Sequence, residues 1–345
     1  MLRTIKKFRL AVIALVAAAA VTVGFAGPAF AYNGLPGETN SWANEVENNV
    51  PLRSSATVSE AFDNNGNLLQ VWRGADNDNI WVSFNHGPPQ AWPSGAGAGA
   101  TAHTYAAPRV IYTSYGFRVF HTGTDGHIYY AGLRYATNII QLGGWVQVPN
   151  NTVTASWSPP SATALPNGSW YLVWTGATGL DVWGTYFNGP NGTYSLPRNI
   201  PGAETIGSPA ISFDSSWNQI VVTWRGLDNF VYFSRQWYGQ SDWSTPAALG
   251  GIRTNQDPAV RLLGNGYGAI TIQNAADRTL HTAVISRDGR ANAWYDETSH
   301  WQSNSIVWLT AVGTILYYIF TADNGLVYWK QAGNFNAFPP AGPSS

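Results

Sequence analysis

Two short apolar segments joined by a polar turn recur along this chain. In the clearest copy, residues 219–235 (QIVVTWRGLDNFVYFSR), β-branched and aromatic residues flank the turn residues Gly226, Asp228 and Asn229. Such residues favour strands, and Gly, Asp and Asn favour a tight turn between them. Both faces of each segment are largely apolar, so each strand needs cover on both sides. The pattern predicts a β-hairpin inside a layered all-β fold.

The hairpin pattern occurs six times, with the last two copies weaker than the others. A small residue precedes the turn in every copy, and these residues recur about every 50 positions: Gly74, Gly123, Gly176, Gly226, Ala275 and Ala322. A repeat of this length with several short strands is typical of a β-propeller. Amphipathic helix patterns are absent from the repeats, which argues against an α-solenoid or an α/β fold.

Further strands complete each repeat. An apolar segment precedes the hairpins, as at residues 109–114 and 208–213, and a Trp-containing segment such as 240–251 follows. The last repeat lacks this outer segment, whereas residues 38–46 near the N-terminus, around Trp42, resemble it. Pairing the two ends would remove exposed strand edges. We therefore predict a six-bladed β-propeller of four-stranded blades, with the ring closed by an N-terminal strand that completes the last blade.

The first 31 residues have the features of a secretory signal peptide. Four basic residues precede the apolar stretch 10–25, and the small-x-small sequence Ala29-Phe30-Ala31 follows it. An uncleaved membrane anchor is the alternative, but the apolar run is short for a membrane span. We expect a signal peptide at 1–31, a propeller at 32–338 and a flexible Pro/Gly/Ser-rich tail at 339–345. The protein is then secreted and extracellular, and the alanine-rich signal suggests a bacterial source.

Composition limits the function classes. Four of the 18 Lys and Arg residues lie in the signal, so the rest of the chain has a net charge of about −5. This charge disfavours nucleic acid and anionic membranes as partners, and no further apolar run predicts membrane insertion. Cysteine is absent, which excludes disulfides and thiolate catalysis. Nothing in the sequence indicates the oligomeric state.

Metal and cofactor sites are not indicated. The six histidines show none of the spacings typical of metal ligands. The run Asp76-Asn77-Asp78-Asn79 offers alternating oxygen ligands that would suit Ca²⁺, but it is also a favourable turn sequence. We predict neither a metal nor a cofactor.

An enzyme of propeller fold is one alternative. Glycoside hydrolysis needs two carboxylates across the scissile bond. The expected inner strands offer Glu60, with Asp214 and Asp257 at strand ends, and nothing marks a pair among them. The sialidase box Ser-x-Asp-x-Gly-x-Thr-Trp is approached only at residues 286–289, without the Thr-Trp ending. A secreted glycoside hydrolase or lyase stays an alternative, and no catalytic residue is predicted.

Aromatic residues give the strongest functional indication, because the chain has 17 Trp and 17 Tyr. Trp and Tyr stack on sugar rings, while Arg, Asp and Asn bond sugar hydroxyls. Carbohydrate-binding candidates are Trp72, Arg73, Asp76 and Trp81 in the first copy, Trp224, Arg225, Asp228 and Tyr232 in the fourth, and the outer-strand residues Trp42, Trp145 and Trp243. Alternatively, Trp72 and Trp224 pack between blades and the aspartates cap turns. Trp92 is a further candidate for a partly exposed ring.

Residues 221–251, VVTWRGLDNFVYFSRQWYGQSDWSTPAALGG, resemble the repeat of bacterial lectin propellers of the Photorhabdus fucose-binding type. They are more distantly similar to fungal fucose lectins and tectonin-type propellers. The matching features are the apolar strand into W-R-G-x-D-N, the aromatic strand after it and the W-S…L-G-G ending. The first and fourth copies match best, and the fifth departs most, with Gln273-Asn274-Ala275 in place of Trp-Arg-Gly.

The resemblance implies a non-catalytic lectin with several shallow sugar sites between neighbouring blades. Its partners would then be glycans, with fucosylated and O-methylated sugars as the first choices. A protein-binding scaffold without sugar affinity is a third possibility, because a propeller fold does not determine a function.

Overall fold

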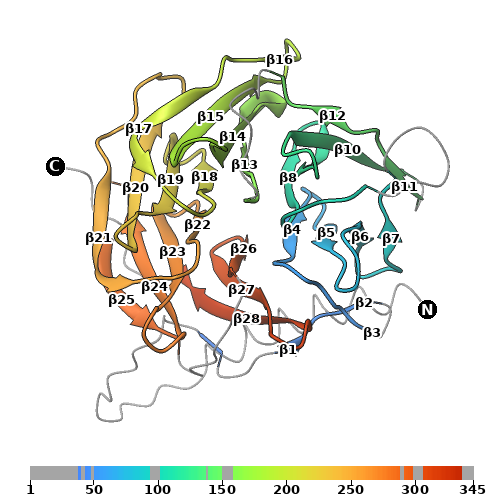
Figure 1. The fold of residues 1–345 in the computed structure, drawn as a ribbon. Helices are drawn as coiled ribbons and strands as arrows, with labels where there is room; N and C mark the ends of the chain where they lie inside the picture. Colours follow the sequence, from blue (N-terminus) through green and yellow to red (C-terminus); the bar gives the residue numbers. More distant parts are fainter. Residues whose placement is uncertain are drawn as a thin grey trace. The chain divides into compact units, whose positions relative to one another are not determined.

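Six antiparallel sheets surround a common axis as the blades of a propeller (Figure 1). The computed structural model describes residues 38–39, 43–47, 50–93, 102–136, 139–149, 158–287, 291–297 and 306–335. Contacts divide the chain into two units, Met1–Asn33 and Gly34–Ser345, and the described residues all belong to the second. They form strands and one 3₁₀ turn, η1 (Pro166–Gly168). No helix among them has the length and apolar character that crossing a bilayer requires.

The first three blades occupy residues 59–204. Blade 1 contains β4 (Ser59–Phe62), β5 (Leu68–Arg73), β6 (Ile80–Phe84) and β7 (Gln90–Ala91). Blade 2 contains β8 (Arg109–Thr113), β9 (Gly116–Thr122), β10 (Ile128–Ala136), β11 (Ile139–Leu142) and β12 (Val146–Gln147). Blade 3 contains β13 (Ser161–Ala164), β14 (Trp170–Thr175), β15 (Asp181–Asn188), β16 (Thr193–Tyr194) and β17 (Arg198–Glu204). In blades 2 and 3, two strands share the outer position.

The other three blades follow the same order. Blade 4 contains β18 (Ala210–Asp214), β19 (Gln219–Arg225), β20 (Phe230–Trp237) and β21 (Ala247–Arg253). Blade 5 contains β22 (Ala259–Leu262), β23 (Tyr267–Gln273), β24 (Leu280–Ser286) and β25 (Ala291–Asp296). Blade 6 contains β26 (Trp308–Val312), β27 (Ile315–Thr321), β28 (Val327–Asn334) and β1 (Ala43–Asn44). A separate two-stranded ribbon joins β2 (Val46–Glu47) to β3 (Val50–Pro51).

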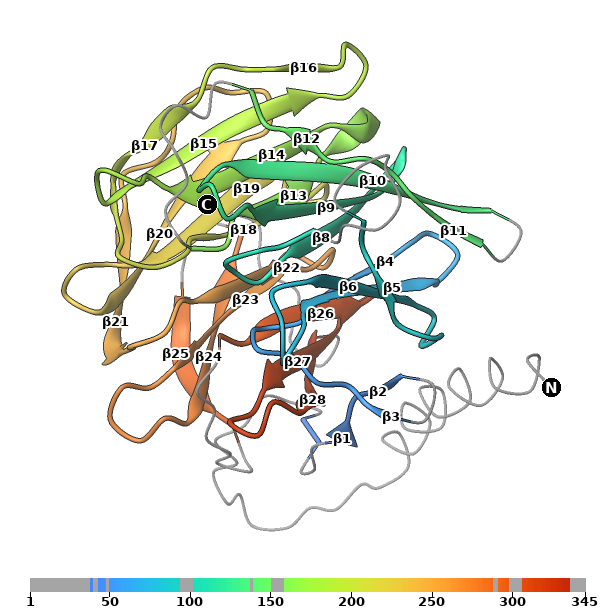
Figure 2. The ribbon, with the colours of Figure 1, turned by 45° about the vertical axis from the view of Figure 1, so that its right-hand side comes forward.

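The N-terminal strand closes the ring. β1 lies beside β28 (Figure 2) and pairs with it antiparallel. Ala43 lies opposite Trp329, and Asn44 lies opposite Tyr328. Each inner strand also contacts the inner strands of both neighbouring blades, including the contact between β26 and β4. The predicted all-β, six-bladed propeller, closed by an N-terminal strand in the last blade, is therefore confirmed.

The hydrophobic core consists of six layers, one at each junction between neighbouring blades. Leu69 and Val82 of blade 1, for example, pack with Val110 and Val119 of blade 2, and each of the other five clusters likewise joins two adjacent blades. This explains why both faces of the repeated strands are apolar, since each blade is covered on two sides.

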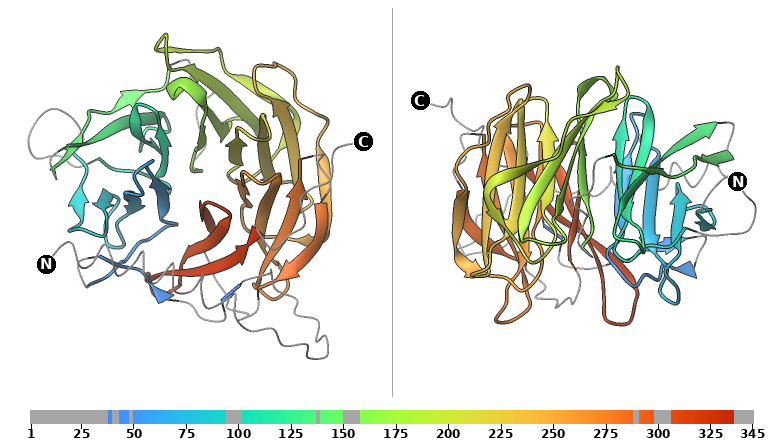
Figure 3. Two further views of the ribbon diagram at one scale, coloured as in Figure 1. Left: turned by 180° about the vertical axis from the view of Figure 1, so that it is seen from behind. Right: turned by 45° about the horizontal axis from the view of Figure 1, so that its top comes forward.

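The inner strands of the blades surround the axis of the ring (Figure 3). At three of the junctions, a serine hydroxyl accepts a hydrogen bond from the inner strand of the following blade. The Val110 amide donates to Ser59 Oγ at 3.0 Å, the Ile211 amide to Ser161 Oγ at 3.3 Å, and the Leu262 amide to Ser212 Oγ at 3.0 Å. In each case the hydroxyl comes from the preceding blade. Unpaired strand edges are costly when buried, so these bonds join consecutive blades at the axis.

A buried ion cluster ties the N-terminal segment to the last two blades. Lys330 of β28 contacts Glu297 of blade 5, and its Nζ lies 2.7 Å from Glu38 Oε1. All three side chains are almost completely buried. Lys330 is the single lysine that follows the predicted signal peptide. Its ammonium group therefore neutralises carboxylates at the place where the ring closes.

Replacing Lys330 with Met should lower the free energy of unfolding by about 3–5 kcal/mol, because two buried carboxylates lose their cation. Urea unfolding measures this change. The matched control is Arg278→Gln, which removes an exposed ion pair with Asp323 (3.8 Å) and should cost under about 1 kcal/mol. Equal effects of the two substitutions would contradict the role given to Lys330.

Candidate functional site

The turn of the repeated hairpin in blade 4 is a compact structural unit. Trp224 and Tyr232 lie opposite each other in register, with ring centroids 6.1 Å apart and planes within 17°. The Tyr232 hydroxyl donates to Asp228 Oδ2 at 2.8 Å, and the Phe230 amide donates to Asp228 Oδ1 at 3.1 Å. A Cβ atom at Gly226 would lie 2.5 Å from the Tyr232 ring. Gly226, Asp228 and Tyr232 therefore shape the turn.

Blade 2 repeats this arrangement with different residues. The His121 and Tyr129 rings stack with centroids 5.6 Å apart, and the Tyr129 hydroxyl donates to Asp125 Oδ2 at 2.7 Å. The Tyr129 ring covers Gly123 as the Tyr232 ring covers Gly226. In these two blades, the aromatic ring above the turn thus explains the glycine before it.

In blade 1, the side chain that accepts hydrogen bonds within the turn lies one residue later than in blades 2 and 4. Asn77 Oδ1 accepts hydrogen bonds from the Asn79 amide at 3.1 Å and from Trp81 Nε1 at 3.4 Å. Asn77 therefore takes the place that Asp228 has in blade 4. Asp76, whose turn-capping role was the structural alternative, is instead exposed beside this turn.

In five of the six hairpins, an arginine or threonine before the turn bonds the loop that enters the next blade. Arg73 Nε donates to the Thr104 carbonyl at 3.1 Å, and Arg225 Nη1 donates to the Asn255 carbonyl at 2.9 Å. Where this position is threonine, the hydroxyl also donates to a carbonyl of the loop that enters a neighbouring blade: Thr122 to Ser158, Thr175 to Gly207 and Thr321 to Ala56. Both predicted arginines therefore have a structural contact, and Arg73 also pairs with Asp78.

Most of the candidate tryptophans lie in the layers between blades. Trp72 and Trp224 are 4% and 1% exposed, so their burial favours packing over stacking on a sugar. Trp92, expected to be partly exposed, is completely buried beside Trp145, with centroids 4.9 Å apart. That expectation was wrong because the outer edge of blade 1 is covered by blade 2. Trp81 keeps an intermediate exposure.

The remaining outer-strand candidates lie apart from one another. Trp145 is half-buried, and its Nε1 donates to the Pro93 carbonyl at 3.2 Å. Trp243 is half-buried and packs edge-on against Tyr171, with centroids 5.8 Å apart. Trp42 lies outside the described residues. The structure therefore places Trp145 at the junction of blades 1 and 2 and Trp243 at that of blades 3 and 4.

A shallow cavity of about 410 Å³ lies between the hairpin turns of blades 6 and 1, and we name it the blade 6/1 pocket. Its lining residues are Arg53, Ser54, Ser55, Ala75, Asp76, Thr321, Ala322, Asp323, Asn324 and Gly325. The Arg53, Asp76, Asp323 and Asn324 side chains are exposed, and Arg53 Nη2 donates to the Asn324 carbonyl at 3.3 Å.

Of these residues, the sequence indicated only Asp76. The other residues could have been found from the predicted closure of the ring, because closure brings the turn of the last hairpin next to the turn of the first. Acceptors from Asp and Asn and donors from Arg and Ser suit a ligand rich in hydroxyl groups.

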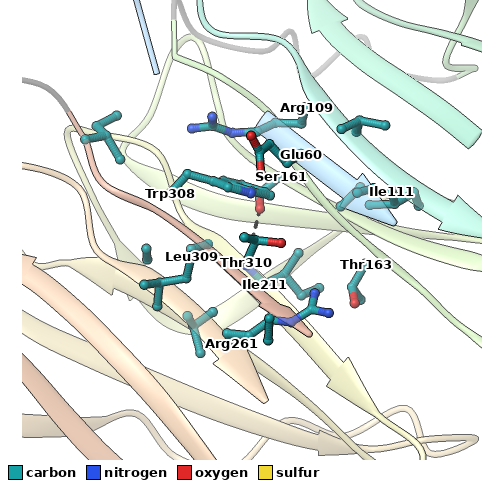
Figure 4. A pocket seen from close by; sticks show the side chains of 18 of the residues that line it. Glu60, Arg109, Ile111, Ser161, Thr163, Ile211, Arg261, Trp308, Leu309 and Thr310 are labelled. Carbon is teal, nitrogen blue, oxygen red and sulfur yellow. Dashed lines mark hydrogen bonds between the residues drawn. The ribbon is translucent and has the colours of Figure 1, made fainter. Parts of the chain in front are cut away.

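A second cavity, of about 280 Å³, follows the axis and is lined by the inner strands of all six blades (Figure 4). Two of the three carboxylates considered for catalysis, Glu60 and Asp257, belong to the lining, and Asp214 does not. Gln70 Nε2 donates to Glu60 Oε1 at 2.6 Å. Burial raises the pKa of Asp257. Within the described ranges, no group of three or more His, Asp or Glu side chains could hold a metal ion.

No family model and no curated protein sequence matches this chain. Solved structures do resemble it. AofleA from Arthrobotrys oligospora has 11% sequence identity and a TM-score of 0.60, over 84% of this chain and 86% of that protein. A fucose-specific lectin from Aleuria aurantia has 10% identity and a TM-score of 0.58, over 81% of this chain and 93% of the lectin.

An enzyme is also among the similar structures. Trypanosoma rangeli sialidase has 14% identity and a TM-score of 0.54, over 86% of this chain but only 60% of the sialidase. The Aleuria aurantia lectin is described as a six-bladed β-propeller. At these identities the similarity concerns the fold, and it agrees with the six blades seen here.

Replacing Gly226 with Ala should lower the free energy of unfolding by about 1–3 kcal/mol, because the added methyl group displaces the Tyr232 ring. The midpoint of urea unfolding measures this. Gly144→Ala is the matched control, since a Cβ there meets no atom within 4 Å, and its effect should stay within about 0.5 kcal/mol. A neutral Gly226→Ala would show that the ring does not need this glycine.

Stability should also depend on pH through His121. Burial lowers the pKa of His121 to about 4, from 6.5 in an unfolded chain. Below pH 6.5 the unfolded chain takes up a proton that the folded chain refuses, so the free energy of unfolding falls as the pH decreases. The loss should reach about 3 kcal/mol near pH 4.

The measurement compares urea unfolding at pH 5.0 and 7.5 for the natural protein and for His121→Phe. Blade 6 has Phe320 in the corresponding position, stacked on Tyr328, so the substitution is compatible with the repeat. The variant should lose stability less steeply with acid. If the variant shows the same pH dependence as the natural protein, groups other than His121 cause the loss of stability in acid.

Proposed function

We propose that this protein is a secreted, non-catalytic lectin that binds glycans at shallow sites between neighbouring blades. The observation that carries this proposal is the blade 6/1 pocket. It gathers exposed carboxylate, amide, guanidinium and hydroxyl groups at the seam of two hairpin turns. Support comes from the similar structures, which include a fucose-specific lectin and a lectin complex with α-methyl-L-fucoside.

Binding would rest on hydrogen bonds rather than on covalent chemistry. Asp76, Asp323 and Asn324 offer acceptors for sugar hydroxyls, and Arg53 offers donors in a fixed planar geometry. An open, shallow pocket gives weak affinity for one sugar, so several sites on a rigid ring would gain from multivalent targets. The half-buried rings of Trp145 and Trp243 mark two further seams at which such sites are proposed.

The finer assignments belong to the same proposal. They are membership of the bacterial Photorhabdus-type group, preference for fucosylated or O-methylated sugars, and export by cleavage after Ala31. Mass spectrometry of the exported protein would test the cleavage, with Tyr32 expected as the first residue.

A glycoside hydrolase is the second candidate function, because Glu60 and Asp257 both line the axial cavity and burial raises the pKa of Asp257. A carboxyl group with a raised pKa can serve as a general acid. Hydrolysis of a polysaccharide that is abolished by Glu60→Gln and by Asp257→Asn would favour this enzyme over the lectin.

A glycan array probed with the exported protein, including fucosylated and O-methylated sugars, tests the lectin. We expect binding to a coherent set of sugars. Asp76→Ala should weaken binding to these sugars about 10-fold or more, as expected for a hydrogen bond to a charged group. The control is Asn64→Ala, an exposed polar residue between β4 and β5 that lies outside the pocket and away from the Trp145 and Trp243 seams. Absence of binding to the whole array would overturn the proposal.

A further inference from the structure

The axial cavity contains two arginines and a tryptophan from three different blades. Arg109 begins β8, Arg261 lies in β22, and Trp308 begins β26. Figure 4 shows Arg109 next to Trp308, with Arg261 in another part of the same lining. The cavity shares no lining residue with the blade 6/1 pocket. It is therefore a separate place on the protein.

Arg109 is a buried cation whose guanidinium has no hydrogen-bond or ion-pair partner among the described residues. The residue is only 5% exposed, and its Nη1 atom is buried without a hydrogen bond. No described carboxylate lies within ion-pair distance of it. The nearest organising contact is the ring of Trp308, whose centroid lies 4.9 Å from the guanidinium carbon.

Trp308 adds a second donor of the same kind. Its indole Nε1 is also buried without a hydrogen-bond partner. A buried donor that stays unpaired costs about 1–3 kcal/mol, and a charged one costs more. Unpaired buried donors on two side chains that contact each other are uncommon in a folded protein, and together they suit an acceptor that enters the cavity.

The charges of the lining indicate which acceptor fits. The carboxylate of Glu60 lines the same cavity, so a doubly charged anion such as phosphate is repelled more strongly than a singly charged one. Burial lowers the pKa of Arg109 to about 10, and nearby Asp257 opposes this only in part, so Arg109 stays charged near neutral pH. Burial also lowers the pKa of Arg261, and the nearby charge of Asp214 partly opposes this.

We propose that the axial cavity binds a small organic monocarboxylate, whose carboxylate accepts hydrogen bonds from the Arg109 guanidinium and the Trp308 indole. The planar fork of arginine matches a carboxylate, and the Trp308 ring supplies an apolar face for the rest of the ligand. A sugar acid and a simple organic acid share this chemistry. The site goes beyond the proposed lectin function and does not depend on it.

Isothermal titration of the whole protein with D-glucuronate, D-glucose, acetate and inorganic phosphate tests the proposal. Glucuronate and glucose differ by the carboxylate at C6. We expect at least one of the two carboxylates to bind, and glucose to bind at least about tenfold more weakly than glucuronate. Arg109→Gln should weaken carboxylate binding about tenfold or more, and Trp308→Phe, which keeps a ring but removes the N–H, several-fold. The control Arg278→Gln changes an exposed arginine and should bind normally.

Three results would overturn the proposal: no binding of either carboxylate at millimolar concentration, equal binding of glucose and glucuronate, or tighter binding of phosphate than of both carboxylates. Because Arg109→Gln could lower stability, Trp308→Phe and the ligand-induced rise in Tm of each variant provide an independent measure. The two sites are also distinguishable. Asp76→Ala should leave carboxylate binding unchanged, and Trp308→Phe should leave binding on the glycan array unchanged.

Discussion

Each blade of this propeller depends on its two neighbours for the burial of its apolar faces. All six core clusters span two adjacent blades, so the folded state needs every junction, including the one between the last blade and the first. The ring is therefore the unit of stability. The pairing of β1 with β28 acts where this dependence is greatest, because only non-covalent contacts hold β1 to the other strands of blade 6. The ion cluster around Lys330 adds to it by tying Glu38 of the N-terminal segment to blades 5 and 6.

Most residues of the repeated hairpin motif serve to form these junctions between blades. The aromatic pair fills the layer between blades, the glycine admits the second ring, and the turn aspartate or asparagine holds the backbone. The following arginine or threonine bonds the loop of a neighbouring blade. The motif therefore recurs because every blade must pack against its neighbours in the same way. Binding chemistry is more readily carried by residues that differ between copies, such as Asp76 and Arg53.

Polar side chains from remote parts of the sequence lie together at two places, and both places exist only because the ring is closed. At the seam of blades 6 and 1, Arg53 meets Asn324. Along the axis, Arg109 of blade 2 meets Trp308 of blade 6. Both pairs join residues about 200 or more positions apart, and both leave polar groups facing a cavity. A rigid ring can hold such groups in place without a cost in ordering when a ligand arrives.

The sequence alone determined the all-β class, the six repeats and the closing strand, because strand period, turn chemistry and a fifty-residue spacing are local properties that the structure confirms. It also placed Asp228 and Asp125 in turns, since a carboxylate bonds the backbone two residues on. Only the tertiary structure decided that Trp92 is buried, that Asn77 rather than Asp76 holds its turn, and that Arg109 faces Trp308. Burial and pairing of a side chain depend on the neighbouring blade, and that blade is remote in sequence.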